Sequence, residues 1–168
     1  MKIYPYLFVG AALFVGGCQS TPSNPNPAAT KDVTVNFEDS DKFTDVRDSS
    51  NGSTNQYYLD ELSKYLKEQA AGRLTAGQTL SVTFTDIDLA GDIPPGRIDD
   101  VRIIKSIYIP RMKLRFQLQD SGGAVIKEGE RNLSDLSYQD TAPPIGQNDP
   151  LRYDKALLAD WIRKEFGA

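Results

Sequence analysis

Alternating apolar and polar residues predict the strands of this chain. Residues 33–37 and 80–84 alternate strictly, with Val33, Val35 and Phe37 apolar in the first segment. A period of two is typical of strands that bury one face. The same criterion predicts strands over 101–109, 112–118 and 124–133, the last two joined by a turn at 120–123. Pro110 separates the first of these strands from the second, since proline cannot donate to a sheet.

Two segments instead repeat at the spacing of a helix. Apolar side chains at i, i+3 and i+4 predict a helix over 56–71, with Asn55 as its cap and Gly72 in the left-handed conformation after it. Asp149 and Pro150 are expected to start a second helix, in which Trp161 lies on the buried stripe. The order strand, helix, four strands, helix predicts an α+β fold. Its mainly antiparallel sheet would have about five strands, with two helices on one face.

The first residues have the pattern of a secretory leader. Lys2 is followed by an apolar run over 3–15, too short to span a membrane comfortably. The segment from Val15 through Gly16 and Gly17 to Cys18 resembles the bacterial lipobox. The resemblance implies that 1–17 is a lipoprotein signal peptide and that Cys18 carries acyl chains. In lipoproteins of two-membrane bacteria, Asp after this cysteine commonly retains the protein in the inner membrane; Gln19 therefore favours the outer membrane, facing the periplasm.

A polar, proline-rich stretch follows the cysteine. Residues 18–30 show no periodicity and are predicted to be a flexible tether, with 31–168 as a single domain. Residues 19–30 can span at most roughly 40 Å. The predicted partner of the tether is the membrane, through the acyl chains on Cys18.

The amino-acid composition excludes several kinds of active site and binding partner. The chain of 168 residues has no histidine, Cys18 is its only cysteine, and its formal charge is −4. Zinc sites draw mainly on Cys and His, and Ser-His-Asp or Cys-His catalysis needs a histidine. Nucleic acid would need a dense basic face. No cofactor, metal or nucleic-acid partner is predicted, and no catalytic residue is assigned.

Charged residues near the strand ends form the candidate polar cluster, Asp45, Asp86, Asp88 and Arg111. By parity, Asp86 and Asp88 continue the buried side of their strand, so one should accept hydrogen bonds from amides near Gly91 or pair with an arginine, Arg111 first. A bulge would instead turn both carboxylates to water. Calcium binding by the acidic residues of 86–100 and acid–base glycoside chemistry are weaker alternatives.

Facing charges predict how the last two strands pair. If Gln119 lies opposite Ala124, Arg115 faces Glu128 and Lys113 faces Glu130. Opposite charges across a ladder stabilise it by ~0.2–1 kcal/mol each. This register would neutralise the basic stripe of 111–115, which otherwise suits anionic lipid or peptidoglycan.

Four segments resemble a family of bacterial envelope proteins of unknown function, many of them lipoproteins. They are 43–46, 85–91, 109–111 and 149–155 with Trp161, and the resemblance covers residues 33–166. Ile109 stands where family members more often have tyrosine. The resemblance implies a fold and an envelope location, and it brings no catalytic residues.

Two functional hypotheses are consistent with these sequence features. The favoured one is a non-enzymatic module that binds another envelope protein or a cell-wall component through the long loops 38–54, 89–100 and 134–148. The alternative is a small enzyme, or a solute or metal binder, that uses Asp86, Asp88 and Arg111.

Overall fold

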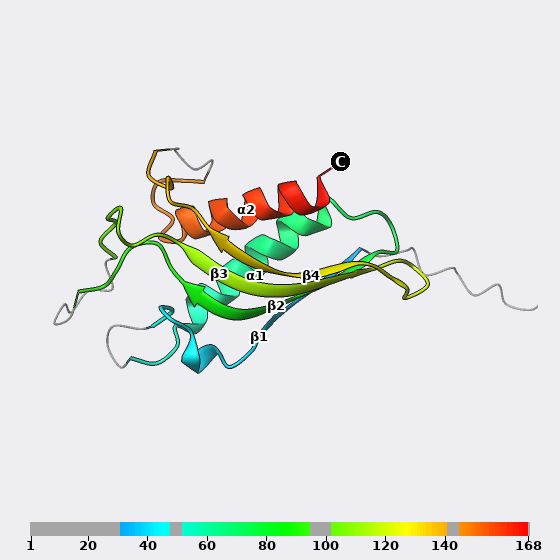
Figure 1. Cartoon of the computed structure of the whole chain (residues 1–168), viewed down its shortest axis with the longest axis horizontal. Coiled ribbons are helices and arrows are strands. Elements are labelled where there is room, and N and C mark those ends of the chain that lie inside the picture. The colour runs from blue at the N-terminus through cyan, green and yellow to red at the C-terminus, as the bar shows by residue number, and fades with distance from the viewer. Residues whose placement is uncertain (1–30, 48–51, 95–101, 141–144, 168) are drawn as a thin grey trace, which may run out of the picture.

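The computed structural model describes residues 31–47, 52–94, 102–140 and 145–167. The predicted signal peptide, Cys18 and the tether lie outside these ranges. The elements, shown in Figure 1, are β1 (Asp32–Phe37), the short 3-10 helix η1 (Ser40–Lys42), α1 (Gln56–Ala71), β2 (Thr79–Asp88), β3 (Arg111–Gln119), β4 (Val125–Ser134) and α2 (Arg152–Phe166).

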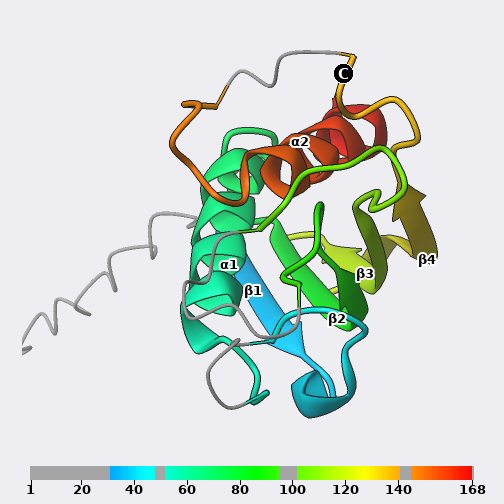
Figure 2. The ribbon, with the colours of Figure 1, turned by 90° about the vertical axis from the view of Figure 1, so that its left-hand side faces the viewer.

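One sheet of four strands, in the order β1-β2-β3-β4, forms the centre of the fold. β1 pairs with β2 in parallel, and α1 makes the crossover between them. β2, β3 and β4 follow as an antiparallel meander. Both helices cover the same face, as Figures 1 and 2 show, so the predicted α+β class with two helices on one face is confirmed.

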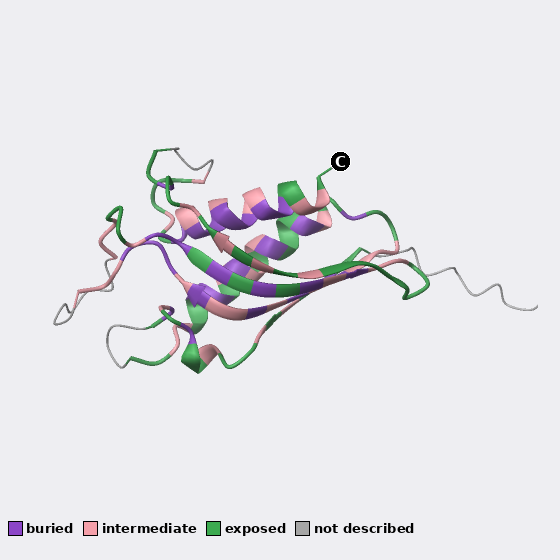
Figure 3. Cartoon of the chain, in the orientation of Figure 1, coloured by how far each residue is buried: buried purple, intermediate pink, exposed green. Residues whose placement is uncertain are grey.

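The core lies between the helices and this face. Leu80, Val82 and Phe84 of β2 are fully buried, and alternate residues of β3 face the same way, which gives the striped burial of Figure 3. Leu59, Leu62 and Leu66 form the buried stripe of α1, and Leu157, Leu158, Trp161 and Ile162 that of α2. No helix of the described residues is long and apolar enough to cross a membrane.

The sheet has one strand fewer than predicted, and its first pair is parallel. Within the described residues 102–110, the backbone-to-backbone hydrogen bonds to other segments go only to the chain just after β2: Ile103 exchanges hydrogen bonds with Asp92, and the Tyr108 carbonyl accepts from the Gly91 amide. Tyr108 closes a turn onto the Lys105 carbonyl, and Ile107 is exposed. This segment folds back over the chain after β2 instead of joining the sheet. The prediction of a strand from its alternating apolar residues was therefore wrong.

The helix ends differ from the predictions at two points. Asn55 caps α1 by accepting a hydrogen bond from the Tyr58 amide, as predicted. Gly72 has φ −67° and is right-handed, because the chain continues into a turn in which the Arg73 amide bonds to Ala70. α2 begins at Arg152, beyond Asp149 and Pro150. Asp149 still accepts from the Leu151 amide just before the helix.

The β3–β4 register is displaced by two residues from the predicted one. Gln119 pairs with Val125, and an irregularity after Leu118 adds a second shift. Arg115 therefore faces Glu130 rather than Glu128, and Lys113 faces Asn132. The predicted charge pairs are therefore not formed. The inward face of β3 is as predicted, because it follows from alternation within the strand and not from its register with β4.

Candidate functional site

The bulge in β2 decides where the two candidate carboxylates lie. The register shifts between Phe84 and Asp86, so Ile87 becomes the next buried residue. Asp86 and Asp88 are turned to the open face of the sheet, where both are partly buried. The prediction that they continue the buried side was wrong, and the bulge of the alternative is present. The carboxylates are not fully turned to water, since both are partly buried and paired with cations.

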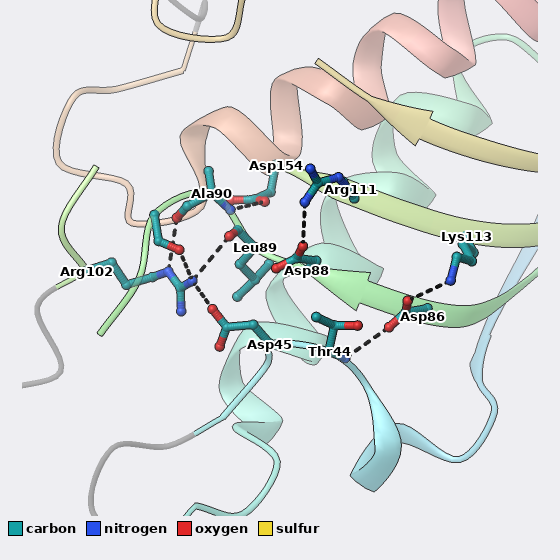
Figure 4. A network of polar contacts seen from close by, with 11 residues as sticks. Thr44, Asp45, Asp86, Asp88, Leu89, Ala90, Arg102, Arg111, Lys113 and Asp154 are labelled. Carbon is teal, nitrogen blue, oxygen red and sulfur yellow. Dashed lines mark hydrogen bonds and ion pairs between the residues drawn. The ribbon is translucent and has the colours of Figure 1, made fainter. Parts of the chain in front are cut away.

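Each carboxylate pairs with the cation directly opposite on β3. Asp88 accepts from Arg111 at 3.0 Å, and Asp86 accepts from Lys113 at 3.1 Å, as Figure 4 shows. The predicted pairing with Arg111 is confirmed. Asp86 also accepts from the Thr44 amide at 2.9 Å, where amides near Gly91 were expected. Arg115, the third cation of the stripe, pairs with Glu38.

These contacts move the two pKa values in opposite directions. Partial burial alone would raise the pKa of Asp86, but the hydrogen bonds from Thr44 and Lys113 outweigh it and the pKa falls below its usual value. For Asp88 burial prevails over the stabilisation by Arg111, and its pKa is raised. Asp45 and Asp86 add to that rise as neighbouring negative charges.

Asp45 contacts the end of β2 through its backbone, and its side chain forms an ion pair nearby. Its amide donates to the Ile87 carbonyl, and its own carbonyl accepts from Leu89, so residue 45 extends the sheet beside the end of β2. Its carboxylate pairs with Arg102 at 2.5 Å. The structure therefore brings all four predicted cluster residues to one end of the sheet, in two separate groups of ion pairs.

Arg102 is the residue of this region that sequence reasoning missed. Its side chain is only 3% exposed. The guanidinium donates to the carbonyls of Leu89, Ala90 and Gly91, and to Asp45. The predicted strand placed Arg102 on a solvated side, and no sequence signal distinguished it from an exposed residue. It holds the 89–91 segment against the chain after β1.

Asp154 fixes the same segment from the helix side. The residue is fully buried, and its carboxylate accepts from the Ala90 amide at 3.0 Å. Burial raises its pKa to about 7, against the lowering effects of the Ala90 hydrogen bond and the charge of Arg102. The signal for it was available, since an acid on the stripe of Leu157, Leu158 and Trp161 is out of place on an apolar face.

Lys155 is a second buried charged residue of α2, and it connects this helix to α1. Its ammonium pairs with Glu61 of α1 at 3.0 Å and with Asp149 at 2.7 Å. Burial opposes the charge, but these hydrogen bonds outweigh it and the pKa of Lys155 is raised. The start of α2 is thereby tied to α1 as well as to the loop after β2.

Asp86, Asp88 and Arg111 line a hollow of about 340 Å³ on the open face. Arg111 and Lys113 are paired there with the two carboxylates. Within the described residues, no three Cys, Asp or Glu side chains are grouped to hold a metal ion. The arrangement favours a structural ladder of ion pairs, in which every charged group of the hollow already has a partner.

The comparisons place most of the chain in one family. Residues 31–164 match the family described as "Protein of unknown function (DUF3016)". No curated protein matches the chain. Two solved structures of the PelC dodecamer from Paraburkholderia phytofirmans match it, one of them a point variant. The first is 12% identical, with a TM-score of 0.42, and the match covers 84% of this chain and 90% of that chain. The variant is 14% identical, with a TM-score of 0.39 and coverage of 84% and 89%.

Proposed function

Since the chain belongs to the DUF3016 family of proteins of unknown function, we propose that it is a lipid-anchored envelope protein and a non-enzymatic binding module. The anchor is Cys18, the tether is 19–30, and the location is the periplasmic face of the outer membrane. This part rests on the sequence: an apolar leader, small residues before Cys18, and Gln19 after it. The partner of the module is another envelope protein or a cell-wall component.

The gathering of the long loops at one end of the sheet supports a binding role. Phe37 pairs with Phe84, while Asp88, Arg111 and Ser134 lie side by side in the register. The chain after β1, after β2 and after β4 therefore leaves the sheet at the same end, which faces the viewer in Figure 2. We call this the loop end. Loops longer than the usual connection are commonly functional.

The buried network beneath the loop end gives these segments a defined arrangement. Arg102 and Asp154 hold 89–91 from two sides, and the Tyr138 hydroxyl donates to the Lys105 carbonyl at 2.8 Å. Ile107 and Leu136, on the two segments that this bond joins, are 70% and 80% exposed. Aliphatic side chains that are exposed on segments fixed by hydrogen bonds offer apolar area to another macromolecule, and they carry no group for acid–base catalysis.

The alternative of a solute site or small enzyme at Asp86, Asp88 and Arg111 has one observation in its favour, the 340 Å³ hollow that they line. A ligand there would have to displace Asp88 from Arg111 or Asp86 from Lys113. The charged side chains of the described lining thus already form ion pairs with each other. The loop end is therefore the better candidate for the binding site.

Acylation of Cys18 is tested directly. The wild-type chain should incorporate labelled fatty acid and sediment with outer membranes. Cys18→Ser should abolish both, because the hydroxyl does not replace the thiol that accepts the diacylglyceryl group. Ser20→Ala, a change two residues away, should leave both unchanged. Fatty-acid labelling of Cys18→Ser at the wild-type level would refute the anchor.

Binding at the loop end is tested by site-specific crosslinking in cells. A photoreactive side chain in place of Ile107 or Leu136 should give discrete adducts with a protein or with cell-wall fragments. Thr34 of β1 and Glu128 of β4 are exposed within strands away from the loop end. They provide control positions and should give none. Adducts of equal yield at all four positions would contradict a binding surface at the loop end.

A further inference from the structure

The β3–β4 hairpin ends in two exposed aliphatic side chains. Val125 is 47% exposed and Ile126 is 50% exposed. The turn before them is well defined: Asp120 accepts from the amides of Gly122 and Ala124, and Gly123 has φ +82°, which favours glycine. The hairpin therefore presents an apolar tip on a fixed support.

This tip lies at the end of the domain where the rest of the chain joins it. The register places Asp32, Thr79, Gln119 and Val125 side by side, so β1 begins where the hairpin turns. Figure 1 shows the C-terminal ends of α1 and α2 at that end as well. The loop end is at the opposite end of the sheet. Lys31, through which residues 1–30 join the domain, is therefore at the end of the sheet that carries the tip. It precedes the edge strand β1, whereas the tip belongs to the other edge strand, β4.

The charges around the tip are nearly balanced. Lys127 follows Ile126 directly, and the nearest carboxylates along the chain are those of Asp120 and Glu128. The last turns of α2 contribute Asp160, Arg163, Lys164 and Glu165. Arg163 and Lys164 pair with Asp160, and Lys127 pairs with Glu165 at 2.8 Å. Electrostatic attraction to anionic lipid is therefore weak there. The long cationic side chains can still extend to headgroups while the aliphatic tip is buried.

We propose that the tip formed by Val125 and Ile126 inserts into the phospholipid surface to which the protein is anchored. The inference rests on the proposed lipid anchor. Two half-exposed aliphatic side chains bind a bilayer only weakly, but a tether confines them near the surface and raises their effective concentration. The consequence is orientation: with the tip in the membrane, the loop end points into the periplasm toward its partner.

A fluorescent label that responds to its surroundings tests the insertion in the full acylated chain. Because acylation consumes the Cys18 thiol, Ser121→Cys provides the only reactive thiol, and it lies in the turn beside the tip. Ser137→Cys, also an exposed turn residue, provides the control at the loop end. The protein is reconstituted in phosphatidylethanolamine and phosphatidylglycerol vesicles. The label at 121 should shift to the blue and be quenched by lipid-borne quenchers, while the label at 137 should do neither.

Two paired substitutions complete the test. Val125→Thr with Ile126→Thr keeps β-branched residues and should reduce lipid quenching at 121 about tenfold, since apolar area drives the contact. Ile107→Thr with Leu136→Thr should leave it unchanged. A label at 121 that behaves as the label at 137, or whose shift depends on protein concentration rather than on lipid, would overturn the proposal; the second result indicates an interface between copies. Fatty-acid labelling of the same samples separates the outcomes. Acylated protein with a solvated tip refutes the insertion alone, while absence of acylation refutes the anchor and the insertion that rests on it.

Discussion

Trp161→Ala should lower the free energy of unfolding by ~3–5 kcal/mol, the range for large aromatic truncations in cores. Trp161 is only 4% exposed. Its ring meets Phe116 of β3 edge-on with centroids 5.8 Å apart, and Phe166 at 5.7 Å. The substitution therefore removes the largest side chain of the stripe by which α2 packs on the sheet. A typical domain has ~5–15 kcal/mol of stability in total, so much of it would be lost.

Thermal and urea unfolding followed by circular dichroism provide the measurement, because Trp161 is the only tryptophan and its fluorescence is absent from the variant. Tyr57→Ala, at an aromatic residue that is 60% exposed, provides a control and should stay within about 0.5 kcal/mol of wild type. Trp161→Phe should cost less than the alanine variant, since a ring remains against Phe116. An unchanged melting temperature for Trp161→Ala would show that α2 does not depend on this contact.

The second prediction concerns the pH dependence that Asp154 imposes on stability. Burial raises its pKa in the folded protein to about 7 from an ordinary value of 3.8. Below about pH 4 the carboxyl is protonated in both states, and it adds no pH dependence. As the pH rises, the unfolded chain ionises first, and the folded state loses stability relative to it until the pH reaches about 7. At ~1.4 kcal/mol per pKa unit, the loss from this group is about 4 kcal/mol.

Asp154→Asn should remove this contribution. The amide oxygen can still accept from the Ala90 amide, and the side chain no longer titrates. The free energy of unfolding of the variant, relative to wild type, should therefore increase by up to about 4 kcal/mol between pH 4 and pH 7. Other groups with shifted pKa values, such as Glu165 at about 2, are common to both proteins and cancel in the difference.

Chemical denaturation of both proteins across this pH range gives the difference directly. Ser121→Ala, in the hairpin turn at the opposite end of the sheet, changes no ionisable group; it is the control and should show no such trend. A constant difference between wild type and Asp154→Asn would mean that the folded protein keeps Asp154 ionised, with Arg102 as the nearest compensating charge.

Local chemistry was enough to predict several elements from the residues alone. α1 is predicted over its whole length, because capping by Asn55 and apolar spacing depend on residues within a few positions of each other. The inward face of β3 and the burial of Trp161 follow from alternation and helical spacing in the same way. The Arg111 pair was predicted because a carboxylate at a strand end needs a nearby cation. The structure forms it because β3 pairs directly with β2 and places Arg111 opposite Asp88.

Long-range pairing was not predictable in this way. Alternation shows which face of a strand is buried but not which neighbour it takes. The tertiary fold therefore decided that β1 pairs with β2 in parallel and that the described residues 102–109 form no strand of the sheet. The bulge after Phe84 had the same origin, and it moved Asp86 and Asp88 to the open face. Arg102 and Asp154 became buried only because 89–91 passes between them, bringing backbone groups that these charged side chains can satisfy. The proposed leader and the proposed acylation of Cys18 rest on local sequence alone. The placement of the tip and the loop end at opposite ends of the sheet follows only from the strand pairing.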